Sequence, residues 1–159
     1  MKSNKKLINV LNTLLANELT AINQNMVHSE IYKKWGYNKL HINVSNQAMD
    51  EMHHAVWLVE RIIFFEGIPN VSKINTINIG KTVSEMINND NEGKENVVNA
   101  YNDAIKFARE VSDQGTVDLL TKILIMEETH LDWIEKQHSQ INQMGMENYL
   151  ANQTEYYIN

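Results

Sequence analysis

The chain has 159 residues, with 14 basic and 20 acidic side chains, one proline, six glycines and no cysteine. This length predicts a single domain over residues 1–159. The absence of cysteine excludes disulfides and thiolate metal sites and suits a reducing cytoplasm, where we expect the protein. The net charge of −6 disfavours nucleic acid as a partner, because phosphate binding needs a basic face, and no apolar run is long enough to cross a membrane.

The first predicted helix covers residues 4–35, with Ser3 or Asn4 as the candidate N-cap. Leucines recur at helical spacing along its first half and form an apolar stripe. Glu18 falls in the middle of that stripe, so its carboxylate is predicted to face the core. Gly36 is typical of the residue that follows a helix.

The second predicted helix covers residues 39–65 and ends before Gly67-Ile68-Pro69. Glu51 shares a face with the apolar residues of this helix. The stretch from 71 to 81 has no helical period and is too long for a tight turn. It is typical of a crossover that joins two parallel helices.

The third predicted helix covers residues 83–112 and begins at a capping box, Thr82-Val83-Ser84-Glu85. Further helices are predicted over residues 116–143 and, short and C-terminal, over residues 146–153. The elements together predict an all-α four-helix bundle with one long crossover between the second and third helices and a short fifth helix.

The sequence Glu-x-x-His occurs twice, as Glu51-Met52-His53-His54 and as Glu127-Glu128-Thr129-His130. Three residues make about one helical turn, so the Glu and the His of each copy share one helix face. Two such helices facing each other present two carboxylates and two imidazoles to one point. This mixed ligand set suits iron, manganese or zinc.

Glu18, Glu51 and Glu127 each lie on an apolar helix face, where a bare carboxylate costs several kcal/mol through desolvation. A bound metal offsets that cost. We therefore predict a metal site made by Glu18, Glu51, His54, Glu127 and His130. The other histidines lack this combined spacing and are predicted to be surface or interface groups: His28, His41, His53 and His138.

Five segments of the chain resemble the bacterioferritins: Leu11–Gln24, Asp50–Asn70, Asn78–Gly80, Glu127–Gln137 and Ile141–Leu150. The resemblance covers nearly the whole chain and implies a ferritin-like bundle that assembles into a homo-oligomeric cage of 24 subunits. It implies iron storage: Fe(II) is oxidised by oxygen or peroxide at a di-iron ferroxidase centre in each bundle and is stored as a ferric mineral. It also implies haem b between pairs of subunits.

Carried over by this resemblance, Glu18 and His54 would bind the first iron, and Glu51 and Glu127 would bridge the two irons. The second iron would take His130 and a glutamate from the third helix. Met52 matches the methionine that ligates haem. Position 52 lies about 100° around its helix from Glu51, so it points away from the bundle interior, as an interface ligand must.

Lys94 stands where the family has the glutamate of the third helix. An ammonium group has only hydrogen-bond donors and cannot bind a metal while protonated. Three carboxylates and one lysine leave a charge of −2, which is enough for one divalent ion. We expect one firm metal position, made by Glu18, Glu51, His54 and Glu127, and a weak or empty second position.

Two arrangements of this region remain open from the sequence. Lys94 can form a salt bridge with Glu127. Alternatively, Gly93 can permit a local bulge that swings Glu92 or Glu95 toward the site.

Three other functions compete with a ferroxidase cage subunit. The first is a non-catalytic haem-binding cage subunit that relies on a partner subunit for iron oxidation, which the combination of Lys94 and Met52 fits. The second is another di-iron bundle enzyme, a peroxidase or oxygenase, which the segment Met144–Gln153 disfavours. The third is a DNA-protecting mini-ferritin, whose ligands lie between subunits, so the repeat within one chain disfavours it.

Overall fold

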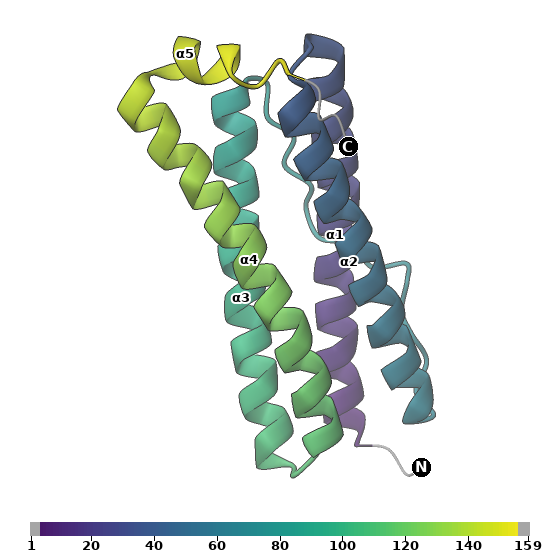
Figure 1. Ribbon diagram of the computed structural model, residues 1–159. Coiled ribbons are helices and arrows are strands. Elements are labelled where there is room, and N and C mark those ends of the chain that lie inside the picture. The colour runs from purple at the N-terminus through teal and green to yellow at the C-terminus, as the bar shows by residue number, and fades with distance from the viewer. Residues whose placement is uncertain (1–3, 156–159) are drawn as a thin grey trace.

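The computed structural model describes residues 4–155 as four long helices and a short fifth helix (Figure 1). The helices are α1 (Lys5–Trp35), α2 (Asn38–Phe64), α3 (Val83–Glu110), α4 (Gln114–Met144) and α5 (Met146–Ala151). The described residues contain no strand, and each predicted helix end lies within two residues of the observed one. The prediction of an all-α ferritin-like bundle with a short fifth helix is confirmed.

Side-chain caps fix where α1 and α3 begin. The Asn4 carboxamide oxygen accepts a hydrogen bond from the Leu7 amide at 3.1 Å, whereas Ser3, the other candidate, lies outside the described residues. The Thr82 hydroxyl accepts from the Glu85 amide at 3.1 Å, as the predicted capping box requires. The Glu85 carboxylate, however, accepts from the Lys81 amide, one residue before the N-cap.

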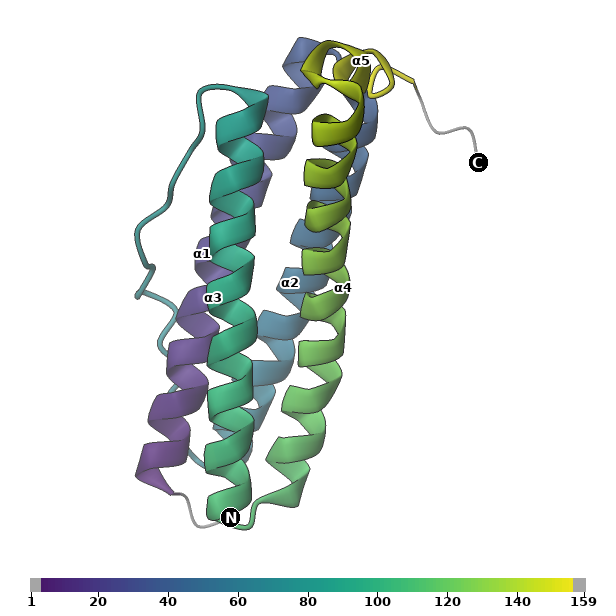
Figure 2. The ribbon, with the colours of Figure 1, turned by 90° about the vertical axis from the view of Figure 1, so that its left-hand side faces the viewer.

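The crossover between α2 and α3 runs along the bundle beside α1 and α3 (Figure 2). Three of its backbone amides donate to side chains of α1: Asn70 to Asn12 at 2.8 Å, Asn75 to Thr20 at 2.8 Å and Asn78 to Gln24 at 3.0 Å. These side-chain acceptors satisfy backbone amides of the crossover that have no helical backbone partner. The crossover therefore covers one side of the bundle at the level of Glu18.

Apolar side chains form two separate cores, one toward each end of the bundle. One contains Leu11, Leu58 and Leu120, and the other contains Leu40 and Ile134. The candidate site residues lie between the two cores along α1, α2, α3 and α4. None of the helices formed by residues 4–155 has the length together with the apolar content that spanning a bilayer requires.

The prediction that His28 is a surface or interface group is wrong. Its side chain is fully buried beneath the crossover, where Nδ1 lies 2.9 Å from Asp90 Oδ1 and Nε2 accepts from the Gly80 amide at 3.1 Å. A polar face of α1 is buried here because the crossover covers it. His53 is exposed, as predicted, and His41 and His138 are half-buried.

Candidate metal centre

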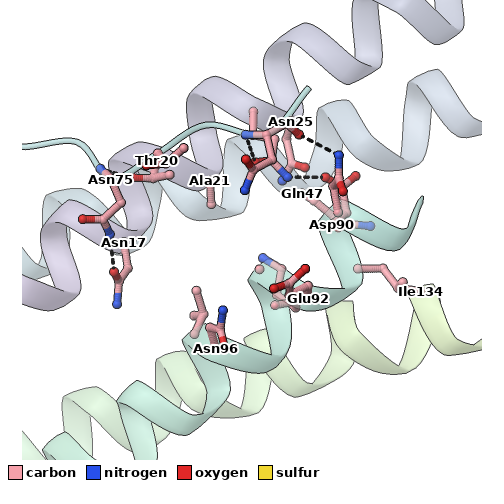
Figure 3. A pocket seen from close by; sticks show the side chains of 17 residues that line it. Asn17, Thr20, Ala21, Asn25, Gln47, Asn75, Asp90, Glu92, Asn96 and Ile134 are labelled. Carbon is pink, nitrogen blue, oxygen red and sulfur yellow. Dashed lines mark hydrogen bonds between the residues drawn. The ribbon is translucent and has the colours of Figure 1, made fainter. Parts of the chain in front are cut away.

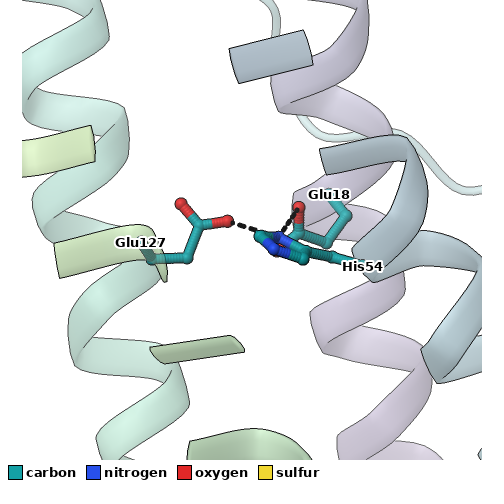
Figure 4. A group of neighbouring side chains, drawn as sticks. All are labelled: Glu18, His54 and Glu127. Carbon is teal, nitrogen blue, oxygen red and sulfur yellow. Dashed lines mark hydrogen bonds and ion pairs between the residues drawn. The ribbon is translucent and has the colours of Figure 1, made fainter. Parts of the chain in front are cut away.

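Three of the predicted ligands form one tight group between the two cores: Glu18 from α1, His54 from α2 and Glu127 from α4 (Figure 4). One potential ligand atom from each lies within 4.8 Å of the others. His54 Nδ1 is 3.0 Å from Glu127 Oε1 and 3.5 Å from Glu18 Oε2. All three side chains are fully buried, so the group has the oxygen and nitrogen donors of a divalent metal site.

Lys94 of α3 extends to the same level of the bundle, between the two cores, which we call the buried layer. Its ammonium donates to Glu127 Oε2 at 2.8 Å and to Glu51 Oε1 at 3.3 Å, and only 4% of the residue is exposed. Helix α3 continues without a bulge through Gly93, and the side chains of Glu92 and Glu95 are exposed. Of the two arrangements that the sequence left open, the structure has the Lys94–Glu127 salt bridge.

Glu51 and His130 adjoin the tight group without being part of it. Glu51 Oε1 accepts from both Lys94 and the Asn25 carboxamide, while Glu51 Oε2 has no hydrogen-bond partner among the described residues. His130 Nδ1 also has no such partner and lies 3.7 Å from Glu127 Oε2. The five predicted residues thus share one buried layer, but the ammonium of Lys94 separates Glu51 from Glu127.

Contacts at the site also involve four residues outside the five predicted ligands. The Tyr101 hydroxyl donates to Glu18 Oε1 at 2.7 Å, and His130 Nε2 lies 2.9 Å from Asp50 Oδ2. Asn25 and Tyr101 follow Glu18 and Lys94 by seven residues, which is two helical turns on the same face, so periodicity could have revealed them. The fourth is Met126, whose Sδ lies 3.3 Å from His54 Nε2.

Burial raises the pKa of two of the three carboxyls, those of Glu18 and Glu51. Burial and the nearby charge of Glu127 raise the pKa of Glu18 from 4.5 to about 7. Burial likewise raises the pKa of Glu51 from 4.5 to about 8, against the opposing effect of Lys94. Near neutral pH the Glu51 carboxyl thus holds a proton and the Glu18 carboxyl is about half protonated, unless a cation replaces these protons.

The other charged groups are shifted by their partners, which outweigh burial. Burial alone lowers the pKa of His54, but hydrogen bonds and charges from Glu127 and Glu18 raise it from 6.5 to about 9. Burial alone raises the pKa of Glu127, but the Lys94 ammonium holds it well below its usual value. The pKa of Lys94 is raised by the carboxylates around it, so this lysine remains a cation.

A cavity of about 170 Å³ lies between α1, α3 and the crossover (Figure 3), and its lining includes the buried residues Asn25 and Lys94. Most of its polar lining consists of carboxamides, among them Asn17, Asn75 and Asn96. The carboxylates of Asp90 and Glu92 also line it. Polar oxygen atoms therefore line the cavity from the crossover to residues that contact the buried layer.

Met52 lies on the outer side of α2, away from the buried layer, and 47% of it is exposed. Met49, one helical turn earlier on α2, is 61% exposed, and Met26 on α1 is 51% exposed. These thioethers form part of an apolar surface that a partner molecule or a flat apolar group could cover.

The chain matches the model of the family described as Ferritin-like domain over residues 8–144. It is 38% identical to the bacterial ferritin of Synechocystis, over 96% of this chain and 99% of that protein. It is 34% identical to the bacterioferritin of Mycobacterium bovis, over 95% of each chain. It is also 38% identical to the bacterial ferritin of Paramagnetospirillum magnetotacticum, over 94% of this chain and 93% of that protein.

Proposed function

This chain belongs to the ferritin family, as one of its bacterioferritins, and from that premise we propose that it is an iron-storage subunit. In this proposal Fe(II) enters the bundle, is oxidised to Fe(III) by oxygen or peroxide, and is stored as a ferric mineral inside a cage of 24 copies. The observation that carries the proposal is the buried group of Glu18, His54 and Glu127.

Unbalanced hydrogen bonding supports a cation in this group. Glu51 Oε2 is buried without a hydrogen-bond partner among residues 4–155, and Glu18 Oε2, also without a hydrogen bond, has only the ion pair with His54 Nδ1 at 3.5 Å. Leaving such an oxygen unpaired costs about 1–3 kcal/mol, and more when it is charged. A divalent ion held by Glu18, His54 and Glu127, with Glu51 Oε2 as a further ligand, would offset that cost. The residues present therefore fit Fe(II), the substrate.

Lys94 limits how many ions the layer can hold. The carboxylates of Glu18, Glu51 and Glu127 carry −3, and the ammonium reduces this to −2, which one divalent ion neutralises. His130 would serve a second ion, but that ion would lie against the Lys94 ammonium. We infer one firm cation position and a weak second one, at which repulsion by Lys94 lowers the affinity.

Oxidation of iron removes one electron from each Fe(II), and two irons together reduce one oxygen molecule to peroxide. Carboxylates favour the more highly charged Fe(III), and the protein contributes the fixed positions of its ligands in a buried layer. A weak second position lowers the fraction of subunits that hold two irons at once. Ferroxidase activity is therefore proposed to be present but slowed by Lys94.

Haem b is proposed between two copies of the chain, where the sulfur of Met52 from each copy would hold its iron. A thioether is a suitable haem ligand and raises the reduction potential of the iron, which would supply an electron-transfer site when bound. The exposure of Met52, with exposed Met49 one turn away on the same helix, fits a flat apolar group at this surface. The same apolar surface supports assembly into a cage.

A second function is favoured specifically by Lys94: a haem-binding cage subunit that does not oxidise iron itself. The ammonium lies where a second iron would need a carboxylate, while Met52 keeps the haem position intact. Such a subunit would depend on a partner chain with a complete di-iron centre. Co-purification of a second ferritin chain in the native cage would support this function over the first.

The test is an anaerobic Fe(II) titration of the assembled protein and of Lys94→Glu. We expect about one Fe(II) per subunit in the wild type and about two in Lys94→Glu, because the variant restores a fourth carboxylate. Glu95→Gln, an exposed change in the same helix, is the matched control and should leave the stoichiometry unchanged. About two Fe(II) in the wild type would overturn the single firm position, and failure of the cage to retain a mineral would overturn iron storage.

A further inference from the structure

The two imidazoles of the buried layer have different partners on their outer nitrogens. His130 Nε2 lies 2.9 Å from a carboxylate oxygen of Asp50. His54 Nε2 lies 3.3 Å from the thioether sulfur of Met126. His54 is fully buried, and its Nδ1 is the atom that faces Glu18 and Glu127. The ligand that faces the firm cation position is thus the one with the weaker outer partner.

The outer partner of a metal-binding histidine affects how strongly the ring donates to the metal. Such a ring usually passes its other N–H to a carboxylate, a carbonyl or water, which fixes its orientation and makes it a stronger ligand. A thioether sulfur is only a weak hydrogen-bond acceptor and carries no charge. His54 therefore gains less donor strength from Met126 than His130 gains from Asp50.

Resting on the function proposed above, we propose that Met126 is a positioning residue that acts through His54 and matches the centre to a single divalent cation. With one divalent ion, the carboxylates of Glu18, Glu51 and Glu127 and the Lys94 ammonium sum to zero charge. A carboxylate at position 126 would leave one negative charge uncompensated and would strengthen His54. Lys94 thus reduces the negative charge around this ion, and Met126 adds none to it.

The geometry permits a direct test at position 126. The sulfur of methionine and the carboxylate oxygens of aspartate are the same number of bonds from Cα, so Met126→Asp can present an oxygen to His54 Nε2. Met126→Asn presents a neutral carbonyl oxygen with the same shape. Met126→Leu keeps a similar apolar volume without an acceptor and controls for packing.

The experiment measures Zn²⁺ affinity by competition with a chromophoric chelator, and the visible absorption of bound Co²⁺, for the assembled wild type and each variant. Met126→Asp is expected to bind Zn²⁺ about 10–100-fold more tightly and to shift the Co²⁺ absorption, because it strengthens His54 as a ligand. Met126→Asn should tighten binding less, and Met126→Leu should match the wild type. In a His54→Gln background, Met126→Asp should lose most of its effect on affinity, because only the added charge then acts on the ion.

The outcomes separate this inference from the proposed function. If the wild type binds Zn²⁺ and both Met126→Asp and Met126→Asn leave its affinity unchanged, the role of Met126 is overturned while the iron centre stands. An effect of Met126→Asp on Zn²⁺ affinity that is as large without His54 as with it overturns it as well. If the wild type binds no divalent cation in the buried layer, the proposed function itself fails. Met126→Asn, which adds no charge, keeps the test decisive if Met126→Asp does not fold.

Discussion

Lys94 is the residue that most affects what the buried layer can do. Its ammonium replaces the positive charge that a second metal would bring and pairs with Glu127 and Glu51 at 2.8 and 3.3 Å. Breaking a buried pair by removing one partner costs about 3–5 kcal/mol, since the remaining charge is left uncompensated. The interaction that stabilises the metal-free layer is therefore the same one that disfavours a second cation.

The protonation of Glu18, Glu51 and His54 predicts how stability depends on pH. Their pKa values in the folded metal-free protein are about 7, 8 and 9, each above the ordinary values of 4.5, 4.5 and 6.5. The folded state thus binds more protons than the unfolded state over this range. Their stabilising contribution is complete below the unfolded values and is lost as pH rises through the folded ones. We expect the melting temperature of the metal-free protein to fall between about pH 6 and about pH 9.

Saturating Zn²⁺ should reverse part of this trend, because the metal needs deprotonated ligands and stabilises more as pH rises. Glu127, whose pKa is lowered, loses its contribution only as pH falls below 4.5, outside this range. Calorimetry with and without Zn²⁺ would measure how the melting temperature changes with pH in each case. Glu18→Gln, which cannot titrate, should flatten the metal-free slope, and a metal-free melting temperature that rises with pH would contradict the assignment.

Helix α3 shows that packing outweighs local propensity in this bundle. Its middle, Asn89-Asp90-Asn91-Glu92-Gly93, is poor in helix-forming residues, yet the helix is continuous from Val83 to Glu110. Asp90 contacts His28 and Gln24 of α1, and Lys94 is bound to two carboxylates. These tertiary contacts supply stability that the segment lacks on its own.

Two glycines, Gly80 just before α3 and Gly93 within it, should respond oppositely to alanine. A Cβ at Gly80 would lie 2.4 Å from the Met86 backbone nitrogen, so Gly80→Ala must move the crossover away from α3. We expect it to lower stability by about 2–4 kcal/mol. A Cβ at Gly93 meets nothing within 4 Å, so Gly93→Ala should raise stability by about 1 kcal/mol through helix propensity.

Chemical denaturation of the two glycine variants beside the wild type would measure both effects. The pair serves as its own control, since each variant adds one methyl group in or next to α3. Equal effects of the same sign would show that the close approach of Gly80 to α3 does not limit the fold.

The bundle as a whole separates its chemistry from its assembly surfaces. Two apolar cores enclose the charged layer from both ends, which isolates it from solvent. Large apolar side chains remain exposed on the outside, including Ile63, Phe64, Ile68 and Val71 near the end of α2. Exposed apolar surface of this kind is typical of a subunit that is covered by its neighbours in an assembly.

The proposed haem position is tested by Met52→Leu, with Met49→Leu as the matched control on the same helix. Leucine keeps the apolar volume of Met52 and removes its sulfur ligand, so we expect reconstituted protein to lose the haem absorption bands while helicity and cage size stay unchanged. Met49→Leu should bind haem like the wild type. Spectroscopic titration with haem and size-exclusion chromatography measure the two properties, and full haem binding by Met52→Leu would exclude Met52 as the ligand.

Most of the fold could be predicted from the residues in order. Asn4, Gly36 and Thr82 marked helix ends, and apolar spacing marked the faces that are buried. The same spacing placed Glu18, His54 and Glu127 on inward faces, and the structure brings these three together. His28 was misassigned because its surroundings come from the crossover, whose path has no periodic signal.

Periodicity is a property of one segment, so it fixes which face of a helix carries a side chain and nothing about the atoms opposite. The pairing of Lys94 with Glu127 and Glu51, the approach of Met126 to His54 and the contact of His130 with Asp50 depend on how four helices pack around a shared layer. That packing decides which charges pair. The sequence therefore defines which residues make up the centre, and the packing of the helices defines which of their side chains contact each other.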